Sequence, residues 1–249
     1  MRIGITEQGD AGLDLSWVNK LNTVDGAILI TKEITPQFID AVLEAPIPTI
    51  VHCTCTGWGG TWLEPNVPIY IEQLLALQRL LERGYPSKNV VLRIDPIVPT
   101  TEGIEKARRV LMYVSDTGVP INRVRISLLD EYKHVKERIK ASGHYPFYGE
   151  GAYSFGPDFH MMADVLNLIS EYPFSYEVCA EDKFAAIANL QVRGCVSPLD
   201  LTIMGLEVDN SLTENPQGRK GCHCLSCKTE LLNRKARCSH GCLYCYWKG

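Results

Sequence analysis

Short runs rich in apolar and β-branched residues alternate along the chain with longer stretches in which apolar residues recur at helical spacing. The runs are RIGIT, AILIT, TIVHCT, NVVLRID, NRVRISL and FSYEVC, and the helical stretches cover residues 35–43, 70–83, 103–115, 158–170 and 183–190. Strands that alternate with amphipathic helices are typical of parallel βα units. Because a full barrel needs eight strands, about six strands predict an α/β fold built as a partial (β/α) barrel.

Polar residues recur on one face of four predicted strands, near the end of each strand. Side chains two residues apart on a strand point to the same face. The sets are Arg93 and Asp95, Arg125 and Ser127, Glu177 with Cys179 and Glu181, and His52 with Thr54 and Thr56. In a barrel the alternate set points inward, and the C-terminal rim holds the sites of such folds. The pattern predicts a polar pocket at this rim, although Arg93 and Asp95 alone also fit a buried structural ion pair.

The composition is that of a globular protein in two parts. The chain has 249 residues, of which 45% are hydrophobic, and this is enough for a sizeable core. We expect the barrel over residues 1–205 and a cysteine-rich, metal-binding segment over residues 206–249, packed on the barrel rim. No apolar stretch approaches the ~18 residues of a membrane span, and the N-terminus lacks a secretory pattern, so we expect no membrane partner and a cytoplasmic location.

Charge is distributed unevenly along the chain. Residues 218–249 contain seven Lys and Arg residues and one Glu, so this segment carries +6 and the remainder −10 of the net charge of −4. A basic segment of this kind fits two interpretations. It is either a solvated tail that balances the negative charge of thiolates, or a surface that attracts an anionic substrate to the metal.

Six of the ten cysteines lie between Cys222 and Cys245, which indicates a metal site in a chain expected to keep its thiols reduced. Cys238, Cys242 and Cys245 have the spacing CxxxCxxC. Three such thiolates can hold an iron–sulfur cubane and leave its fourth iron open to another ligand. Zinc is the alternative, because the pairs Cys224/Cys227 and Cys242/Cys245 have nearly the spacing of a zinc ribbon. That alternative predicts a binding module for nucleic acid or a protein partner instead of an enzyme.

The spacing CxxxCxxC with an aromatic residue before its last cysteine resembles the signature of the radical S-adenosylmethionine superfamily. Its C-terminal position resembles an uncharacterised bacterial family of unknown function whose C-terminal cysteines look like that signature. The stretches that carry this resemblance are ILITK, LEPNVP, VLRIDPIVP, RISLLDEY, EVCAED, RGC, CHC and CSHGCLYCYW, and they extend over residues 27–247. GYPSKNVVLRIDPI is also distantly similar to a strand of spore photoproduct lyase, a radical-type lyase that acts on DNA.

The resemblance implies an iron–sulfur enzyme. Cys238, Cys242 and Cys245 would hold a 4Fe-4S cluster that binds S-adenosyl-L-methionine and cleaves it reductively to a 5′-deoxyadenosyl radical, with an electron from an external donor. The radical would remove a hydrogen atom from a small-molecule or nucleic-acid-derived substrate, which the basic segment suggests is anionic. The cofactor-binding residues implied in this way are Tyr244 against the adenine, Tyr246, and Lys32 and Thr54 near the methionine part. Arg93, Ser127 and Glu177 are further candidates, mainly because their strand positions point them inward.

A second group of cysteines is also similar to positions of the uncharacterised family. These residues are Cys179, Cys195, Cys222 and Cys224, with Cys227 in addition, and they would hold an auxiliary iron–sulfur cluster or zinc.

These expectations combine into one hypothesis about the end of the chain. Residues 238–247 are expected to fold back over the strand ends, with the cluster opposite Thr54 and Lys32, so that the loop occupies in space the place it has in related barrels. The zinc alternative instead predicts one tetrahedron made of Cys224, Cys227, Cys242 and Cys245, away from the strand ends.

Overall fold

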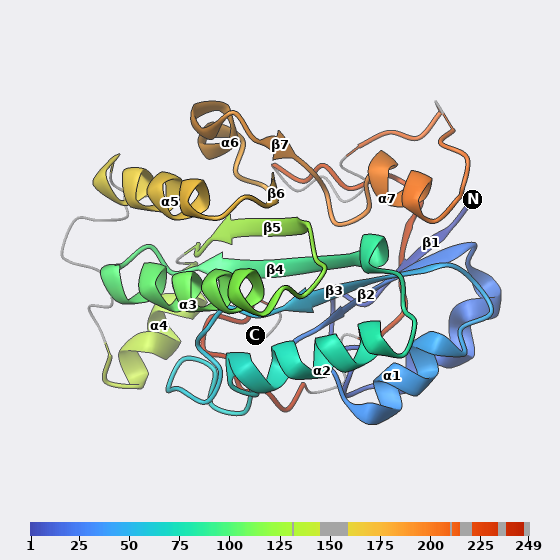
Figure 1. Ribbon diagram of the computed structural model, residues 1–249, viewed down its shortest axis with the longest axis horizontal. Helices are drawn as coiled ribbons and strands as arrows, with labels where there is room; N and C mark the ends of the chain where they lie inside the picture. The colour runs from blue at the N-terminus through green and yellow to red at the C-terminus, as the bar shows by residue number, and fades with distance from the viewer. Residues whose placement is uncertain (131, 145–158, 210, 215–220, 234–237, 247–249) are drawn as a thin grey trace.

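The chain forms one parallel sheet covered by helices, as the computed structural model shows for residues 1–130, 132–144, 159–209, 211–214, 221–233 and 238–246 (Figure 1). The strands are β1 (Ile3–Ile5), β2 (Gly26–Thr31), β3 (Thr49–Thr54), β4 (Val90–Ile97), β5 (Arg123–Leu128), β6 (Ser175–Val178), β7 (Gln191–Val192) and β8 (Lys228–Glu230). Their order across the sheet is β7-β6-β5-β4-β3-β2-β1-β8, and every pairing among them is parallel. This sheet confirms the predicted α/β class and is consistent with a partial (β/α) barrel.

The helices connect successive strands, as parallel pairing requires. They are α1 (Pro36–Leu43), α2 (Tyr70–Glu82), α3 (Thr101–Thr117), α4 (Lys133–Ala141), α5 (Phe159–Glu171), α6 (Asp182–Ala188) and α7 (Pro198–Ile203), with 3-10 turns η1 (Leu15–Thr23) and η2 (Ser87–Asn89). Local sequence determines where several of them begin. At the start of α1, Thr35 precedes Pro36, the first helical residue, and its hydroxyl accepts a hydrogen bond from the Phe38 amide. At the start of α7, Ser197 forms a capping box with Asp200.

The two faces of the sheet have different partners. Along β4, Val90, Leu92 and Ile94 pack into the large core beneath the helices, whereas Val91 belongs to a second apolar cluster on the other face. Arg93 shares the face of Val91 by alternation. The polar residues that lie two positions apart on the predicted strands therefore do share the face of the sheet opposite the large core.

Two strands were not predicted from the sequence. Strand β7 has two residues, and β8 is the sequence KTE, in which every residue is half-buried and no apolar alternation exists. Strand β8 forms because it pairs with β1, in a register that places Lys228 beside Ile3. Part of the segment 206–249 is thus built into the sheet. In the described part of the chain no helix has the length and apolar character needed to cross a bilayer.

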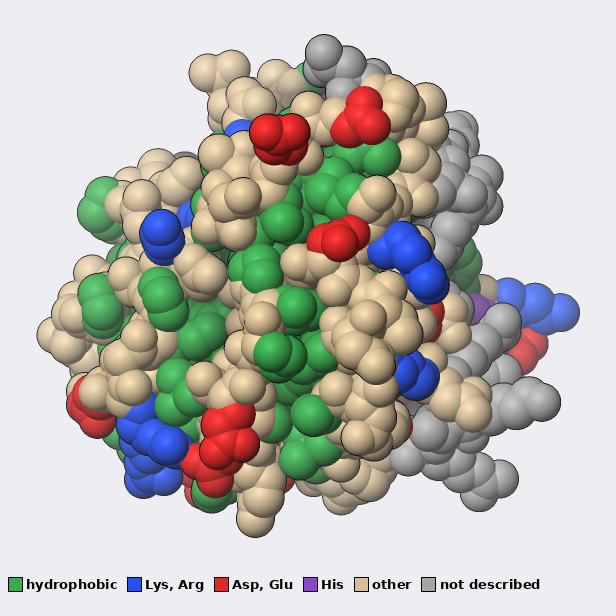
Figure 2. All heavy atoms as spheres, turned by 90° about the vertical axis from the view of Figure 1, so that its right-hand side faces the viewer, with side chains coloured by type: hydrophobic (Ala, Val, Ile, Leu, Met, Phe, Trp, Pro, Cys, Tyr) green, Lys and Arg blue, Asp and Glu red, His purple; other side chains and the backbone are tan. Residues whose placement is uncertain are grey.

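The strands begin at one end of the molecule and finish at the other, where the cavity described below lies. Figure 2 views the end at which they begin, where apolar side chains gather among scattered Lys, Arg, Asp and Glu.

A network of buried charged side chains joins β5 and β6 to α7. Arg125 is fully buried, and its guanidinium donates to Glu177 Oε2 at 2.7 Å and to the Gly194 carbonyl at 3.1 Å. Arg123 donates to Glu177 and, at 2.8 Å, to Asp200. Because each carboxylate meets at least one guanidinium, the network holds β5, β6 and α7 together without an unpaired acid.

Candidate metal centre and cofactor pocket

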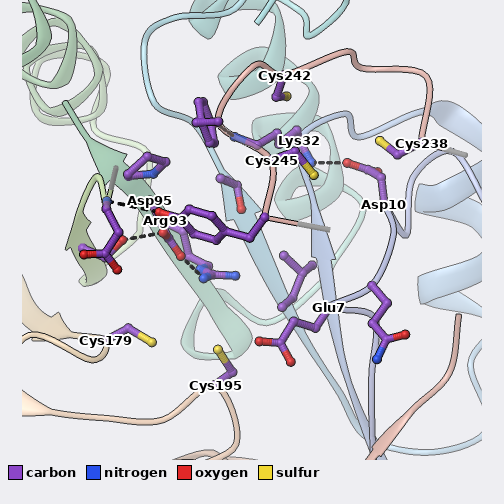
Figure 3. Close-up of a pocket in the computed structure, with 18 of the residues that line it drawn as sticks. Glu7, Asp10, Lys32, Arg93, Asp95, Cys179, Cys195, Cys238, Cys242 and Cys245 are labelled. Atoms are coloured by element: carbon purple, nitrogen blue, oxygen red, sulfur yellow. Dashed lines mark hydrogen bonds and ion pairs between the residues drawn. The ribbon is translucent and has the colours of Figure 1, made fainter. Parts of the chain in front are cut away.

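A cavity of about 760 Å³ opens at the C-terminal ends of the strands. Figure 3 shows Cys238, Cys242 and Cys245 along one side of it and Cys179 and Cys195 on the opposite side. Of the residues predicted from the sequence, those that line it are Lys32, Thr54, Arg93, Asp95, Ser127, Cys179, Glu181, Cys195, Cys238, Cys242, Tyr244, Cys245 and Tyr246. The structure therefore brings most of the predicted site residues together from segments more than 200 positions apart.

The loop that carries the CxxxCxxC cysteines, described over residues 238–246 and called here the rim loop, is fixed to the rim by hydrogen bonds. The His240 ring lies 2.9 Å from Asp10 Oδ2 and 3.2 Å from the Asn66 carbonyl. The Asn66 side chain donates to the Ser239 carbonyl at 2.8 Å, and the Leu243 amide donates to the Leu63 carbonyl at 3.0 Å. The loop consequently covers the strand ends, as the hypothesis about the end of the chain requires.

Asp10 is the centre of this attachment. Its carboxylate is buried and accepts hydrogen bonds from the Gly12 amide at 2.9 Å, the Thr31 hydroxyl at 2.6 Å and the Lys32 amide at 2.7 Å, besides its contact with His240. Burial disfavours the charged form of His240, but the hydrogen bond and charge of Asp10 raise its pKa above the ordinary value. Sequence reasoning missed both residues. The available signals were the position of Asp10 after the first strand and of His240 between two motif cysteines.

A second set of contacts joins the loop to β2 and to the LEPNVP turn. The Lys32 ammonium donates to Glu64 Oε1 at 2.8 Å and lies 2.7 Å from the Tyr244 hydroxyl, which itself contacts Glu64. The Thr56 hydroxyl donates to the other Glu64 oxygen at 2.8 Å. Burial opposes the charge on Lys32, yet Glu64 and the nearby thiols Cys242 and Cys55 together raise its pKa, so the ammonium stays protonated. Sequence reasoning did not identify Glu64, although it lies within a stretch that carried the resemblance.

The three loop thiols lie close enough to affect one another. Burial raises the pKa of Cys242 to about 12, the Lys32 ammonium acts in the opposite direction, and Glu64, Cys238 and Cys245 add to the rise. The Arg138 guanidinium reaches the Cys245 carbonyl at 2.5 Å. Lys32 and Arg138 therefore place positive charge beside thiols that would be ionised as metal ligands.

Whether these thiols fit a metal depends on the kind of centre. In the described part of the chain no three His, Cys, Asp or Glu side chains surround a single point closely enough to hold one metal ion. A 4Fe-4S cluster makes a different demand, because each thiolate binds its own iron and the sulfurs stay farther apart than around one ion. Three thiols of a single loop that face one cavity suit such a cluster.

Two further predicted residues offer polar groups to the cavity. The Thr54 side chain is buried, and its hydroxyl has no hydrogen-bond partner among the described residues. The Arg93 guanidinium contacts Asp95, which also accepts from the Ser127 hydroxyl, so these three residues form one chain of contacts on the cavity wall. The ion pair considered as an alternative is therefore present, and it lies on the wall of the cavity.

Glu177 does not line this cavity. Its two oxygens are held by Arg123 and Arg125 in the buried network. These guanidinium groups outweigh the effect of burial and lower the pKa of the Glu177 carboxyl. Glu177 lies on β6 two residues before Cys179, which does line the cavity, and its carboxylate is taken up by the arginines instead.

The second group of cysteines divides in the structure. Cys179, Cys195, Cys222, Cys224 and Cys227 all pack in the apolar cluster on the inner face of the sheet, and Cys179 and Cys195 also line the cavity. Cys242 and Cys245 belong to a different cluster, around Trp58 and Leu63. The two halves of the proposed zinc ribbon are thus separate, and they do not form one tetrahedron in the described residues.

Most of the basic segment lies outside the described residues. This holds for Arg219, Lys220, Arg234, Lys235, Arg237 and Lys248, and also for Trp247 of the motif. Lys228 is described, and it contacts Glu7, which lines the cavity.

Among curated proteins no match is found. A family described as "Domain of unknown function (DUF1848)" matches residues 15–247. The matched range contains all three cysteines of the rim loop and every strand of the sheet except β1. Because this match spans most of the chain, the protein belongs to the DUF1848 family.

Proposed function

We propose that the protein is an iron–sulfur enzyme of the radical S-adenosylmethionine type, in which Cys238, Cys242 and Cys245 hold a 4Fe-4S cluster. One observation carries the proposal. The CxxxCxxC loop is attached by the chain's own hydrogen bonds over a cavity that Lys32 and Thr54 also line. A terminal metal clip would have no need of such a cavity.

The residues around the cavity suit the parts of S-adenosylmethionine. Lys32 is a buried cation whose charge is maintained by Glu64, and it provides attraction for a carboxylate. The Thr54 hydroxyl is available for a polar group of the ligand. Contacts with Lys32 and Glu64 fix the Tyr244 hydroxyl, so its ring is held in one orientation, which suits packing against adenine.

The bound cluster would supply one electron, received from an external donor, to the sulfonium of S-adenosylmethionine, releasing methionine and a 5′-deoxyadenosyl radical that removes a substrate hydrogen atom. The protein's own task is to position S-adenosylmethionine and to exclude water from the cavity. Cys242 and Tyr244 are buried, so the rim loop shields its side of the cavity from solvent. Free thiols in this number suit a reducing compartment, and we therefore assign the protein to the cytoplasm.

A competing function is a zinc-stabilised module that binds nucleic acid or a protein partner. The separation of Cys224 and Cys227 from Cys242 and Cys245 speaks against it. We propose the enzyme on this ground as well.

Metal analysis of the full chain tests the proposal. After anaerobic purification and reconstitution with iron and sulfide, the wild-type protein should contain at least about four iron and four sulfide per chain. Replacing Cys238, Cys242 and Cys245 together by Ala should remove about four of each, while far-UV circular dichroism stays unchanged. Colourless protein that contains zinc in place of iron would exclude the enzyme.

A further inference from the structure

The cavity extends along the sheet beyond the residues proposed for S-adenosylmethionine. Lys32 and Thr54 lie at the ends of β2 and β3, whereas Glu181 follows β6, two residues past Cys179, which Figure 3 shows across the cavity from the rim-loop cysteines. Because neighbouring strands lie about 4.8 Å apart, the ends of β3 and β6 are separated by roughly 14 Å along the sheet. A cavity of about 760 Å³ is large for a single ligand pocket, so it has room for a small second molecule beside the cofactor.

Glu181 presents a carboxylate to this far end of the cavity. Its side chain is half-buried, and its Oε1 accepts a hydrogen bond from the Leu128 amide at 3.2 Å. Its Oε2 has no hydrogen-bond partner in the part of the chain that the structure describes. Asp130 and Asp182 add negative charge beside it. A partly desolvated carboxylate among other acids is stabilised by a cation, and the far end of the cavity therefore favours a positively charged group.

The cations of the cavity, in contrast, already have acidic partners. Among the described residues, the Lys and Arg side chains that line it are Lys32 and Arg93, and each contacts a carboxylate. The acid Glu7 contacts Lys228, which balances its charge. An anionic group would thus meet no cation without a carboxylate partner among these residues, whereas a cationic group would meet Glu181.

Aromatic side chains lie at the same end of the cavity as Glu181. The rings of Tyr132 and Tyr246 line it, with their centroids 5.1 Å apart and their planes at 86°. The Asp130 amide, two residues after the Leu128 amide that binds Glu181, donates to the Tyr246 hydroxyl at 3.3 Å. Because the faces of aromatic rings attract organic ammonium groups, the rings and the carboxylate favour a ligand of the same charge.

Two buried polar atoms indicate independently that the cavity wall is built for a polar ligand. Thr54 and Arg93 are partners in the register of β3 and β4, and both line the cavity. They are only 4% and 8% exposed, yet the Thr54 hydroxyl and the Arg93 Nε have no hydrogen-bond partner among the described residues. Since buried polar groups are nearly always hydrogen-bonded, these atoms point to a polar molecule that binds in the cavity.

We propose that the substrate of this cavity carries an organic ammonium group, which Glu181 binds while Tyr132 and Tyr246 contact it through their rings. The inference rests on the proposed function in so far as the bound molecule is a substrate; the site itself recognises an ammonium whatever reaction follows. It differs in charge from the anionic substrate that the basic segment suggests.

The test measures the binding of three probes of one shape to the full chain without iron. Benzylammonium, benzyl alcohol and benzoate are cationic, neutral and anionic, and their dissociation constants are obtained by nuclear magnetic resonance titration at pH 8. The wild-type protein should bind benzylammonium at least tenfold more tightly than either other probe, and Glu181→Gln should weaken it at least tenfold. Asp182→Asn is the matched control, because this neighbouring acid is exposed and lies outside the cavity, and it should stay within about twofold of wild type.

A second variant keeps the test decisive if Glu181→Gln fails to fold by circular dichroism. Tyr132 is 41% exposed, so Tyr132→Leu should fold, and loss of its ring should weaken benzylammonium binding by about two- to tenfold. Unchanged binding in Tyr132→Leu would reject the site. Benzoate that binds as tightly as benzylammonium, no binding of benzylammonium, or equal losses in Glu181→Gln and Asp182→Asn would overturn the proposal.

These measurements separate the ammonium site from the proposed function, because none of them uses iron or S-adenosylmethionine. A protein that forms 5′-deoxyadenosine but shows no preference for benzylammonium rejects the substrate class alone. A protein that prefers benzylammonium through Glu181 but forms no 5′-deoxyadenosine keeps the ammonium site and rejects the enzyme.

Discussion

Replacing His240 by Ala should release the rim loop while leaving the sheet folded. His240 is buried and makes one hydrogen bond to the Asp10 carboxylate and one to the Asn66 carbonyl. A hydrogen bond to a charged group contributes about 1.5–3 kcal/mol and a neutral one about 0.5–1.5 kcal/mol, so the substitution should cost about 2–4 kcal/mol. The large core beneath the helices contains no part of this loop, so the cost should fall on loop attachment and much less on global unfolding.

The assay is the rate at which N-ethylmaleimide labels Cys242 in the metal-free protein, followed by peptide mass spectrometry. Cys242 is only 6% exposed, so labelling requires the loop to open. A change of 2–4 kcal/mol should speed labelling roughly 30- to 1,000-fold. His223→Ala is the matched control, because His223 is a partly exposed histidine, also with acidic partners, outside the cavity. If Cys242 is labelled equally fast in His240→Ala and wild type, this account of the loop attachment is wrong.

Three further substitutions test other parts of the structure. Arg125→Met should lower the free energy of unfolding by about 3–5 kcal/mol in urea denaturation, because it removes the hydrogen bonds that the buried guanidinium donates to the Glu177 carboxylate and to the Gly194 carbonyl. Arg109→Ala, in an exposed pair on α3, should change it by less than about 0.5 kcal/mol. Gly194→Ala should cost about 1–3 kcal/mol by the same measurement, since its Cβ would displace Cys224. Lys32→Met should weaken S-adenosylmethionine binding by about 10–100-fold in calorimetry, with iron content unchanged; equal affinity would remove Lys32 from the cofactor site.

The elements of the sheet could be predicted because each long strand has its own apolar pattern. In β4 the alternation of Leu92 and Ile94 with Arg93 and Asp95 specifies both the strand and its two faces. Strand β8 has no such pattern, and it exists only because β1 offers an unpaired edge. Pairing of this kind is a tertiary effect that a local window of sequence does not contain.

The site was predicted in part, for a related reason. Spacing and resemblance identified the cysteines and Lys32, but the acids that hold them in place were missed. Asp10 belongs to no motif, and Glu64 lies in the stretch LEPNVP without a role that its position reveals. Their roles follow from distant donors such as His240 and Tyr244, which only the folded chain brings near. The register of β6 likewise decides that Glu177 is used by the arginine network.

The central claim is that the rim loop holds a cluster that cleaves S-adenosylmethionine. The most direct measurement is the formation of 5′-deoxyadenosine and methionine by the full chain, loaded with iron and sulfide, reduced with dithionite and supplied with S-adenosylmethionine, by liquid chromatography with mass spectrometry. The wild-type protein and Cys222→Ser should form both products, and Cys242→Ser should give only the background of the reductant. Iron-loaded wild-type protein that forms no 5′-deoxyadenosine, or Cys242→Ser that forms as much as wild type, would contradict the account.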